Sequence, residues 1–172
     1  MNRQENKPEF YHVIKHYVKK EHSPPGPPVT FYALFNFILT KDSQIFFFRS
    51  YPETNCIINE PQLPPRINLT QAMVEEIKIK DLNDFLTRTI VDSISQSEQF
   101  FATISSPTDT IRNIAFKTIT DFFKIKHIDA CHIRNWTEEE KYVMASIIGH
   151  TTYNPDSIKW TIGFSGEQSD NN

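Results

Sequence analysis

The stretch FYALFNFILTKDSQIFFFRSY, residues 31–51, decides the fold that the sequence predicts. It contains two runs of aromatic and aliphatic residues, 31–40 and 43–51, and such residues favour β-strands. The dipeptide Lys41–Asp42 separates the runs, so the stretch predicts a β-hairpin. Apolar side chains fall on both faces of the first run, which is typical of a central strand covered on both sides.

Weaker patterns on either side of the hairpin predict the remaining elements. Alternation or short apolar runs indicate further strands at 56–59, 76–80, 100–106, 128–133 and 158–164. Apolar residues three or four apart indicate helices at 9–20, 82–94, 107–124 and 137–149, with a shorter one inside 69–76. Asp81 is placed to cap the second of these helices. Thr137 and Glu140 match a capping box at the start of the last, which we expect to end near Gly149.

These elements favour one α+β domain. We expect residues 1–166 to form a single domain, a mainly antiparallel sheet with about four amphipathic helices packed on it. A chain of 172 residues is long enough to bury such a core without disulfides or metal. The proline-rich residues 23–29 are expected to form a rigid connector after the N-terminal helix 9–20. Residues 167–172 are expected to form a disordered tail.

Composition favours a cytoplasmic protein. No stretch has the length of apolar residues needed for a membrane span, and the first residues do not match a secretion signal. The two cysteines, Cys56 and Cys131, form no CxxC pair, so we expect reduced thiols and no zinc ribbon. The net charge of −3 argues against general nucleic-acid binding.

Charge is unevenly distributed along the chain. From Thr137 to the end there are six acidic residues and two lysines, giving 2 − 6 = −4. We therefore expect the partner-binding residues to be Glu138, Glu139 and Glu140. Aromatic residues are common hot spots of interfaces, which adds Trp136, Tyr153 and Tyr51, in or beside the loops at 52–66 and 151–157.

Sequence motifs for catalysis or cofactor binding are weak. Four glycines exclude a GxGxxG motif and a P-loop, so no cofactor is expected. His12 and His16 have metal-ligand spacing on a helix but no third ligand, so no metal is expected. Cys131 and His132 are adjacent in an expected strand and point to opposite faces. His127 shares a face with Cys131 but lies about 13 Å away along a strand.

The sequence therefore predicts a non-enzymatic protein-binding domain. An intracellular inhibitor of the immunity or antitoxin kind, which blocks a basic partner protein, fits its size and acidic C-terminal quarter. The alternative is a small hydrolase or transferase that brings Cys131, His127 and His132 together with Asp129. A third hypothesis is an RNA-binding domain whose basic face contains Arg112, Lys117 and Lys124.

Overall fold

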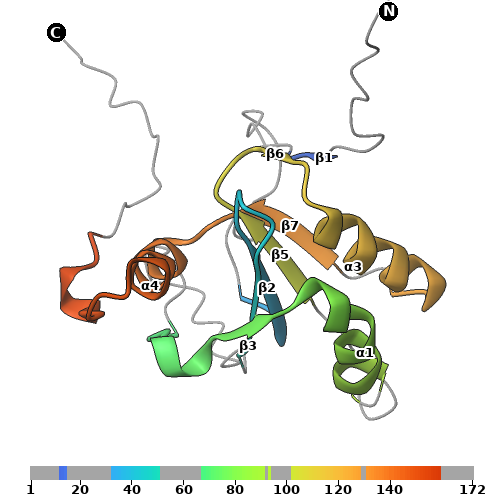
Figure 1. Ribbon diagram of the computed structural model, residues 1–172, viewed down its shortest axis with the longest axis horizontal. Coiled ribbons are helices and arrows are strands. Elements are labelled where there is room, and N and C mark those ends of the chain that lie inside the picture. The colour runs from blue at the N-terminus through green and yellow to red at the C-terminus, as the bar shows by residue number, and fades with distance from the viewer. Residues whose placement is uncertain are drawn as a thin grey trace, which may run out of the picture.

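A computed structural model describes residues 12–14, 32–50, 67–91, 93, 102–128 and 131–159 of the 172-residue chain. The main feature is a five-stranded mixed sheet with strand order β4-β3-β2-β5-β7 (Figure 1). Its strands are β2 (Phe35–Leu39), β3 (Ile45–Arg49), β4 (Glu75–Ile77), β5 (Ala102–Ser106) and β7 (Cys131–Asn135). Helices pack on both faces of this sheet.

The predicted hairpin is confirmed as β2 and β3. The two strands pair antiparallel, from Phe35 opposite Arg49 to Leu39 opposite Ile45. The backbone N–H of Thr40 donates to the carbonyl of Gln44 at 3.1 Å and closes the turn. All five residues of β2 are buried, and the strand lies third in the sheet, as expected for a central strand.

The expectation of a mainly antiparallel sheet is not confirmed. β3 pairs antiparallel with β2 and with β4, whereas β2 pairs parallel with β5 and β5 pairs parallel with β7. A parallel neighbour requires a long crossover connection, and β5 and β7 are joined through a helix. The periodicity of a strand contains no information about the direction of its neighbours, so the sequence predicted the pairing direction correctly only within the hairpin.

Three described α-helices cover the sheet: α1 (Leu82–Leu86), α3 (Ile114–Ile125) and α4 (Glu138–Gly149). α1 and α3 lie on one face and α4 on the other (Figure 1). α1 continues as a wider π-helical turn at Thr87–Val91, and its N-cap Asp81 makes no side-chain capping bond. α3 begins later than Pro107, because Asn113 caps it by accepting from the backbone N–H of Ala115 at 2.8 Å.

The N-terminal helix predicted at 9–20 is wrong where the structure describes it. His12–Val13 form β1, which pairs antiparallel with β6 (Thr110–Ile111) in a small second sheet. The backbone N–H of Ile14 donates to the carbonyl of Asp109 at 2.7 Å, and the Ile14 side chain is buried in the core. Pairing with a distant segment therefore overrides the local helical pattern. The rest of 9–20 lies outside the described residues.

Several shorter elements differ from the sequence prediction. The helix expected inside 69–76 is a 3-10 turn, η1 (Gln71–Met73), and the strand expected at 76–80 is shorter, because β4 gives way to the 3-10 turn η2 (Ile79–Asp81). A last 3-10 turn, η4, spans Pro155–Ser157. Residues 158–159 are not in a strand. The remainder of 158–164, the strand at 56–59, the connector 23–29 and the tail 167–172 lie outside the described residues.

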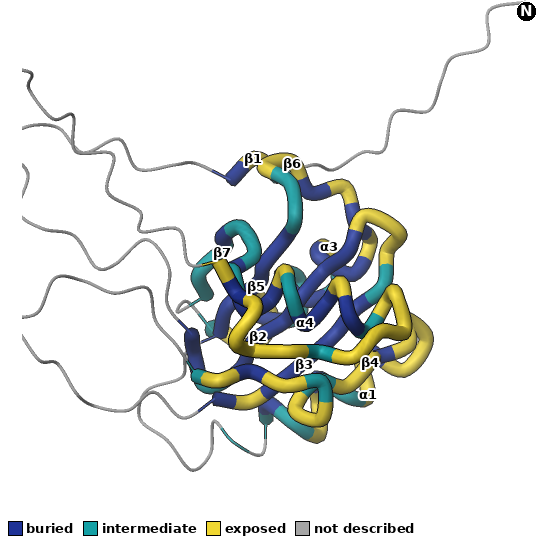
Figure 2. The backbone as a smooth tube through the Cα atoms, turned by 90° about the vertical axis from the view of Figure 1, so that its left-hand side faces the viewer, coloured by how far each residue is buried: buried dark blue, intermediate teal, exposed yellow. Residues whose placement is uncertain are grey.

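Two hydrophobic clusters occupy the two faces of the sheet. The first contains Phe35, Phe37, Phe47 and Ile104 under α1 and α3, and the second contains Ile38, Phe46 and Phe48 under α4. In Figure 2 the strands under α4 are mostly buried. Among the described residues, no helix is both long and apolar enough to span a membrane.

Candidate functional site

The face of the sheet under α4 changes from apolar to polar across its width. On β3 it presents Phe46 and Phe48, whereas on β5 the corresponding inward positions are Thr103 and Ser105. Both polar residues are fully buried, as is Asn36 on β2. Burying a polar group is costly unless it is hydrogen-bonded. The hydrogen bonds of this polar half of the face therefore decide whether any group there is left to bind a ligand.

Both the oxygen and the nitrogen of the Asn36 side-chain amide are hydrogen-bonded within the protein. Its Oδ1 accepts from Thr103 Oγ1 at 2.8 Å and from the backbone N–H of Ala33 at 2.9 Å. Its Nδ2 donates to the Ala33 carbonyl at 2.6 Å and to Ser50 Oγ at 3.1 Å. Asn36 therefore ties the start of β2 to β5 and to the end of the hairpin, and it has no donor left for a ligand.

Arg134 and Glu140 form a buried ion pair. The guanidinium donates to both carboxylate oxygens, at 2.7 and 2.8 Å, and the two side chains are 3% and 0% exposed. Glu140 also completes the predicted capping box. Its carboxylate accepts from the Thr137 backbone N–H at 2.8 Å, and its own N–H donates to Thr137 Oγ1 at 3.1 Å. Burial by itself lowers the pKa of Arg134, but the charge and hydrogen bonds of Glu140 outweigh it and raise the pKa.

Glu139 joins three distant parts of the chain. Its carboxylate accepts from the Tyr32 hydroxyl at 2.8 Å and from the backbone N–H groups of Ile67 and Leu69, each at 3.2 Å. The Tyr32 oxygen also lies 2.6 Å from Thr137 Oγ1. Burial, and then the charges of the two neighbouring glutamates, raise the pKa of Tyr32. The phenol is therefore held neutral and is no nucleophile.

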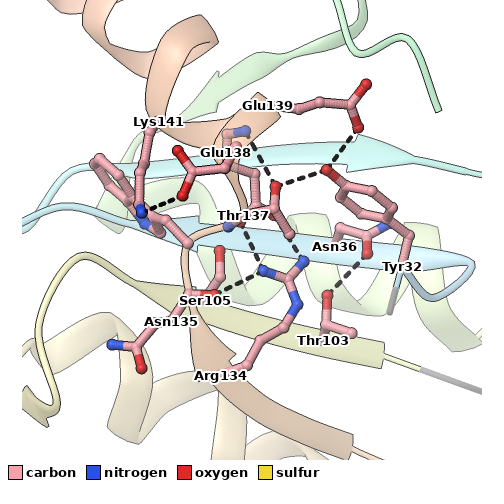
Figure 3. Close-up of polar contacts among 12 residues, drawn as sticks. Tyr32, Asn36, Thr103, Ser105, Arg134, Asn135, Thr137, Glu138, Glu139 and Lys141 are labelled. Atoms are coloured by element: carbon pink, nitrogen blue, oxygen red, sulfur yellow. Dashed lines mark hydrogen bonds and ion pairs between the residues drawn. The ribbon is translucent and has the colours of Figure 1, made fainter. Parts of the chain in front are cut away.

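We call these residues the buried polar cluster; its members are Tyr32, Asn36, Thr103, Arg134, Thr137, Glu139 and Glu140. Figure 3 labels all of them except Glu140. They come from β2 and the segment just before it, from β5, from β7 and from the N-cap and first turn of α4. The guanidinium of Arg134 also lies 5.3 Å from the centre of the Tyr32 ring. Because the donors and acceptors are used within the protein, the cluster fastens the N-terminal turn of α4 to the sheet.

The structure corrects the expectation of an exposed acidic surface at 138–140. Glu139 and Glu140 are buried, because the capping box turns Glu140 back over the helix start and Glu139 lies on the inward side of α4. Only Glu138 is partly exposed, at 21%, and it forms an ion pair with Lys141 at 2.7 Å. The acidic surface inferred from sequence counting is therefore largely internal.

Trp136 and Tyr153, the two expected aromatic anchors, are half-buried. Both pack against the core cluster under α4. The indole N–H of Trp136 donates to the carbonyl of Leu39 at 3.2 Å, which holds the ring against the end of β2. Burial, and then the charge of Glu139, raise the pKa of Tyr153. Tyr51, the third aromatic residue, lies outside the described residues.

The structure does not bring the sequence-predicted thiol and imidazoles together in a reactive arrangement. Cys131 packs against the core cluster under α1 and α3, while His132 is the next residue of β7 and lies on the other face. His127 is exposed after the end of α3, with a positive φ of 55°. Asp129 lies outside the described residues. Burial raises the pKa of Cys131 to about 12, so the thiolate is scarce at neutral pH.

This raised pKa predicts slow alkylation of Cys131. Three pH units above its ordinary value of 9.0 correspond to an about 1000-fold lower thiolate fraction, and the thiolate is the nucleophile. Treatment with iodoacetamide at pH 8, followed by peptide mass spectrometry, is expected to leave Cys131 largely unmodified in the folded protein. In denaturant the same cysteine is expected to react at the rate of a free thiol. Rapid labelling in the folded state would contradict a raised pKa of the Cys131 thiol.

The buried polar cluster contains residues that the sequence analysis did not single out, namely Tyr32, Asn36, Thr103 and Arg134. A signal existed for Arg134, since a strand arginine six residues before a capping-box glutamate is a ready ion-pair partner. No local signal existed for Tyr32, which is 107 residues from Glu139 in the chain.

Comparison with family models, with curated proteins and with solved structures finds no match to this chain. Among the described residues, no group of three or more histidine, cysteine, aspartate or glutamate side chains is placed to hold a metal ion. The described contacts of the buried polar cluster are made within the protein.

Proposed function

We propose that this chain acts by binding another protein and performs no catalysis of its own. More specifically, we propose an inhibitor of the immunity or antitoxin kind, which blocks the functional site of its partner. A chain of 172 residues is large enough for such a role.

The observation that supports this proposal is that the buried ionisable side chains are hydrogen-bonded or paired within the protein. The carboxylates of Glu139 and Glu140 and the guanidinium of Arg134 are buried and bonded to one another or to the backbone. The Cys131 thiol has a raised pKa, opposite to the shift that activates a nucleophile. By contrast, several large apolar side chains are exposed, among them Ile114, Ile125 and Ile148. Exposed apolar groups beside charged ones are typical of interaction surfaces.

The exposed surface of residues 137–159 has no excess of negative charge. The sequence analysis expected a basic partner because of the acidic C-terminal quarter. Between 137 and 159 there are four acidic residues and two lysines, giving 2 − 4 = −2, and the buried Glu139 and Glu140 account for this whole excess. The exposed charges of this segment therefore balance, and the proposal does not depend on a basic partner.

Affinity capture followed by direct binding measurement tests the proposed function. The tagged protein is incubated with lysate of its own host, retained proteins are identified, and the most abundant is purified and titrated. A 1:1 complex with a dissociation constant of about 1 μM or below is expected. The same affinity is expected for Cys131→Ala, which serves as the control for the catalytic alternative.

The alternative of a small hydrolase or transferase gives the opposite result in the same preparation. A substrate screen would reveal turnover, and Cys131→Ala or His132→Ala would reduce that turnover at least a hundredfold while circular dichroism showed a folded protein. That outcome, or the absence of a saturable complex with any retained protein, would contradict the proposed function.

A further inference from the structure

The outward side of α3 has exposed apolar residues at both ends of the helix. Ile114 is 49% exposed and Ile125 is 73% exposed, whereas Ile119 and Phe123 face the core. The two isoleucines are eleven residues apart, three turns of helix, so they lie on one line along the helix about 16 Å from each other. Single exposed isoleucines are common. Two on the same outward face of one helix do not contribute to the core, so core packing does not explain their apolar character.

Positive charge gathers beside these two isoleucines. Between 112 and 126 there are four basic residues and one acidic residue, giving 4 − 1 = +3, in a chain whose net charge is −3. The four are Arg112, Lys117, Lys124 and Lys126, and all are exposed. We call the surface formed by these four residues with Ile114 and Ile125 the α3 ridge.

Most of this positive charge is not neutralised within the protein. Lys117 forms an ion pair with Asp121, and the ammonium of Lys126 lies 5.9 Å from the centre of the Phe122 ring. Within the described part of the chain, Arg112 and Lys124 have neither an ion pair nor a side-chain hydrogen bond. Lysines near the C-terminus of a helix interact favourably with its dipole, which explains Lys124 and Lys126 but not the 73% exposure of Ile125 between them.

We propose that the α3 ridge binds an acidic segment of a partner protein, an amphipathic helix with two apolar side chains about 16 Å apart and carboxylates around them. The apolar pair of the partner packs on Ile114 and Ile125, and its carboxylates lie against Lys124, Lys126 and Arg112. This inference rests on the proposed protein-binding function and specifies the surface and the chemistry of the partner.

The composition of the α3 ridge favours protein over RNA. Single-stranded nucleic acid is bound by aromatic side chains on which bases stack, within a positively charged groove. The exposed apolar side chains of the ridge are aliphatic, and the neighbouring Phe122 and Phe123 are half-buried and buried. The net charge of +3 for residues 112–126 is also modest for a surface that would bind phosphates alone.

A binding titration with a synthetic peptide tests the inference. The probe is a fluorescent acidic peptide of about 16 residues with two leucines eleven positions apart among glutamates and alanines, and a second peptide has serine in place of both leucines. Fluorescence anisotropy at low salt is expected to show saturable binding of the first peptide and at least tenfold weaker binding of the second. Raising the salt concentration is expected to weaken the first complex, because exposed charges are screened.

Two variants test whether the peptide binds at α3. The double substitution Lys124→Glu with Lys126→Glu is expected to weaken the leucine peptide at least tenfold, and Ile125→Ser is expected to do the same. Lys41→Glu, an exposed charge reversal in the β2–β3 turn, is the matched control and is expected to change the affinity less than twofold. All of these side chains are exposed, so the variants are expected to fold, which circular dichroism verifies.

Three outcomes would overturn the inference. The first is no saturable binding of the leucine peptide, and the second is an equal effect of the α3 variants and the Lys41→Glu control on its affinity. The third is tighter binding of a mixed-sequence RNA than of the peptide, with that RNA binding lost in the Lys124/Lys126 variant. The last would assign the ridge to nucleic acid. If a captured partner still bound the α3 variants with unchanged affinity, the inference would fail while the proposed protein-binding function would stand. If no partner were captured at all, the proposed function itself would fail.

Discussion

The substitution Glu140→Gln is expected to destabilise the fold by about 3–5 kcal/mol. Glutamine keeps the shape of the side chain but removes the carboxylate charge that pairs with the guanidinium of Arg134, which is 3% exposed. Removing one partner of a buried ion pair has a cost of this size, because the remaining charge stays desolvated. Urea unfolding followed by circular dichroism measures the difference in the free energy of unfolding.

The matched control is Asp121→Asn, which removes the same charge from the exposed pair with Lys117. Exposed ion pairs contribute little, so a loss below about 1 kcal/mol is expected. The double variant Arg134→Met with Glu140→Leu is expected to cost less than either single change, since it removes both charges of the pair together. A loss in Glu140→Gln no larger than in Asp121→Asn would contradict the buried pair.

Phe37→Ala is expected to cost about 3–5 kcal/mol, because it removes the ring that joins the hairpin to α3. Phe37 is 0% exposed, and the centre of its ring lies 5.2 Å from that of Phe47 and 6.3 Å from that of Phe123. Thermal and urea unfolding both report this loss, as a lower midpoint of the transition.

Phe122→Ala is the matched control for that prediction, since it removes the same side chain from a half-buried position on α3. A cost less than half that of Phe37→Ala is expected, because the transfer and cavity terms both scale with the buried volume. Equal costs in the two variants would mean that the β2 ring is not the centre of the core.

The exposure of the acidic residues at 138–140 is where sequence and structure diverge most. Counting charges along the chain predicted an acidic contact at 138–140. Folding instead places Glu139 and Glu140 inside, bonded to Tyr32 and Arg134, whose positions relative to α4 are set by the sheet. Counting cannot distinguish an internal carboxylate from an exposed one. The basic residues Lys117 and Lys124 were visible in the sequence, but the isoleucines beside them were not recognised as exposed until the core was known.

Local interactions explain what was predicted correctly. The β2–β3 hairpin, the capping box at Thr137 and the helix end at Gly149 each depend on residues within a few positions of one another. Such contacts repeat at short, regular spacings, and the amino-acid pattern reveals them directly.

Contacts between distant residues decided the rest. The parallel pairing of β2 with β5, the extended conformation of His12–Val13 and the inward direction of Glu139 each depend on a partner far away in the chain. In each case the local pattern permits more than one conformation, and the free energy of burying and pairing with that partner selects one. Periodicity and capping signals therefore predicted the hairpin, α3 and α4 of this protein, while only tertiary packing determined the directions of the strands and which charges remain on the surface.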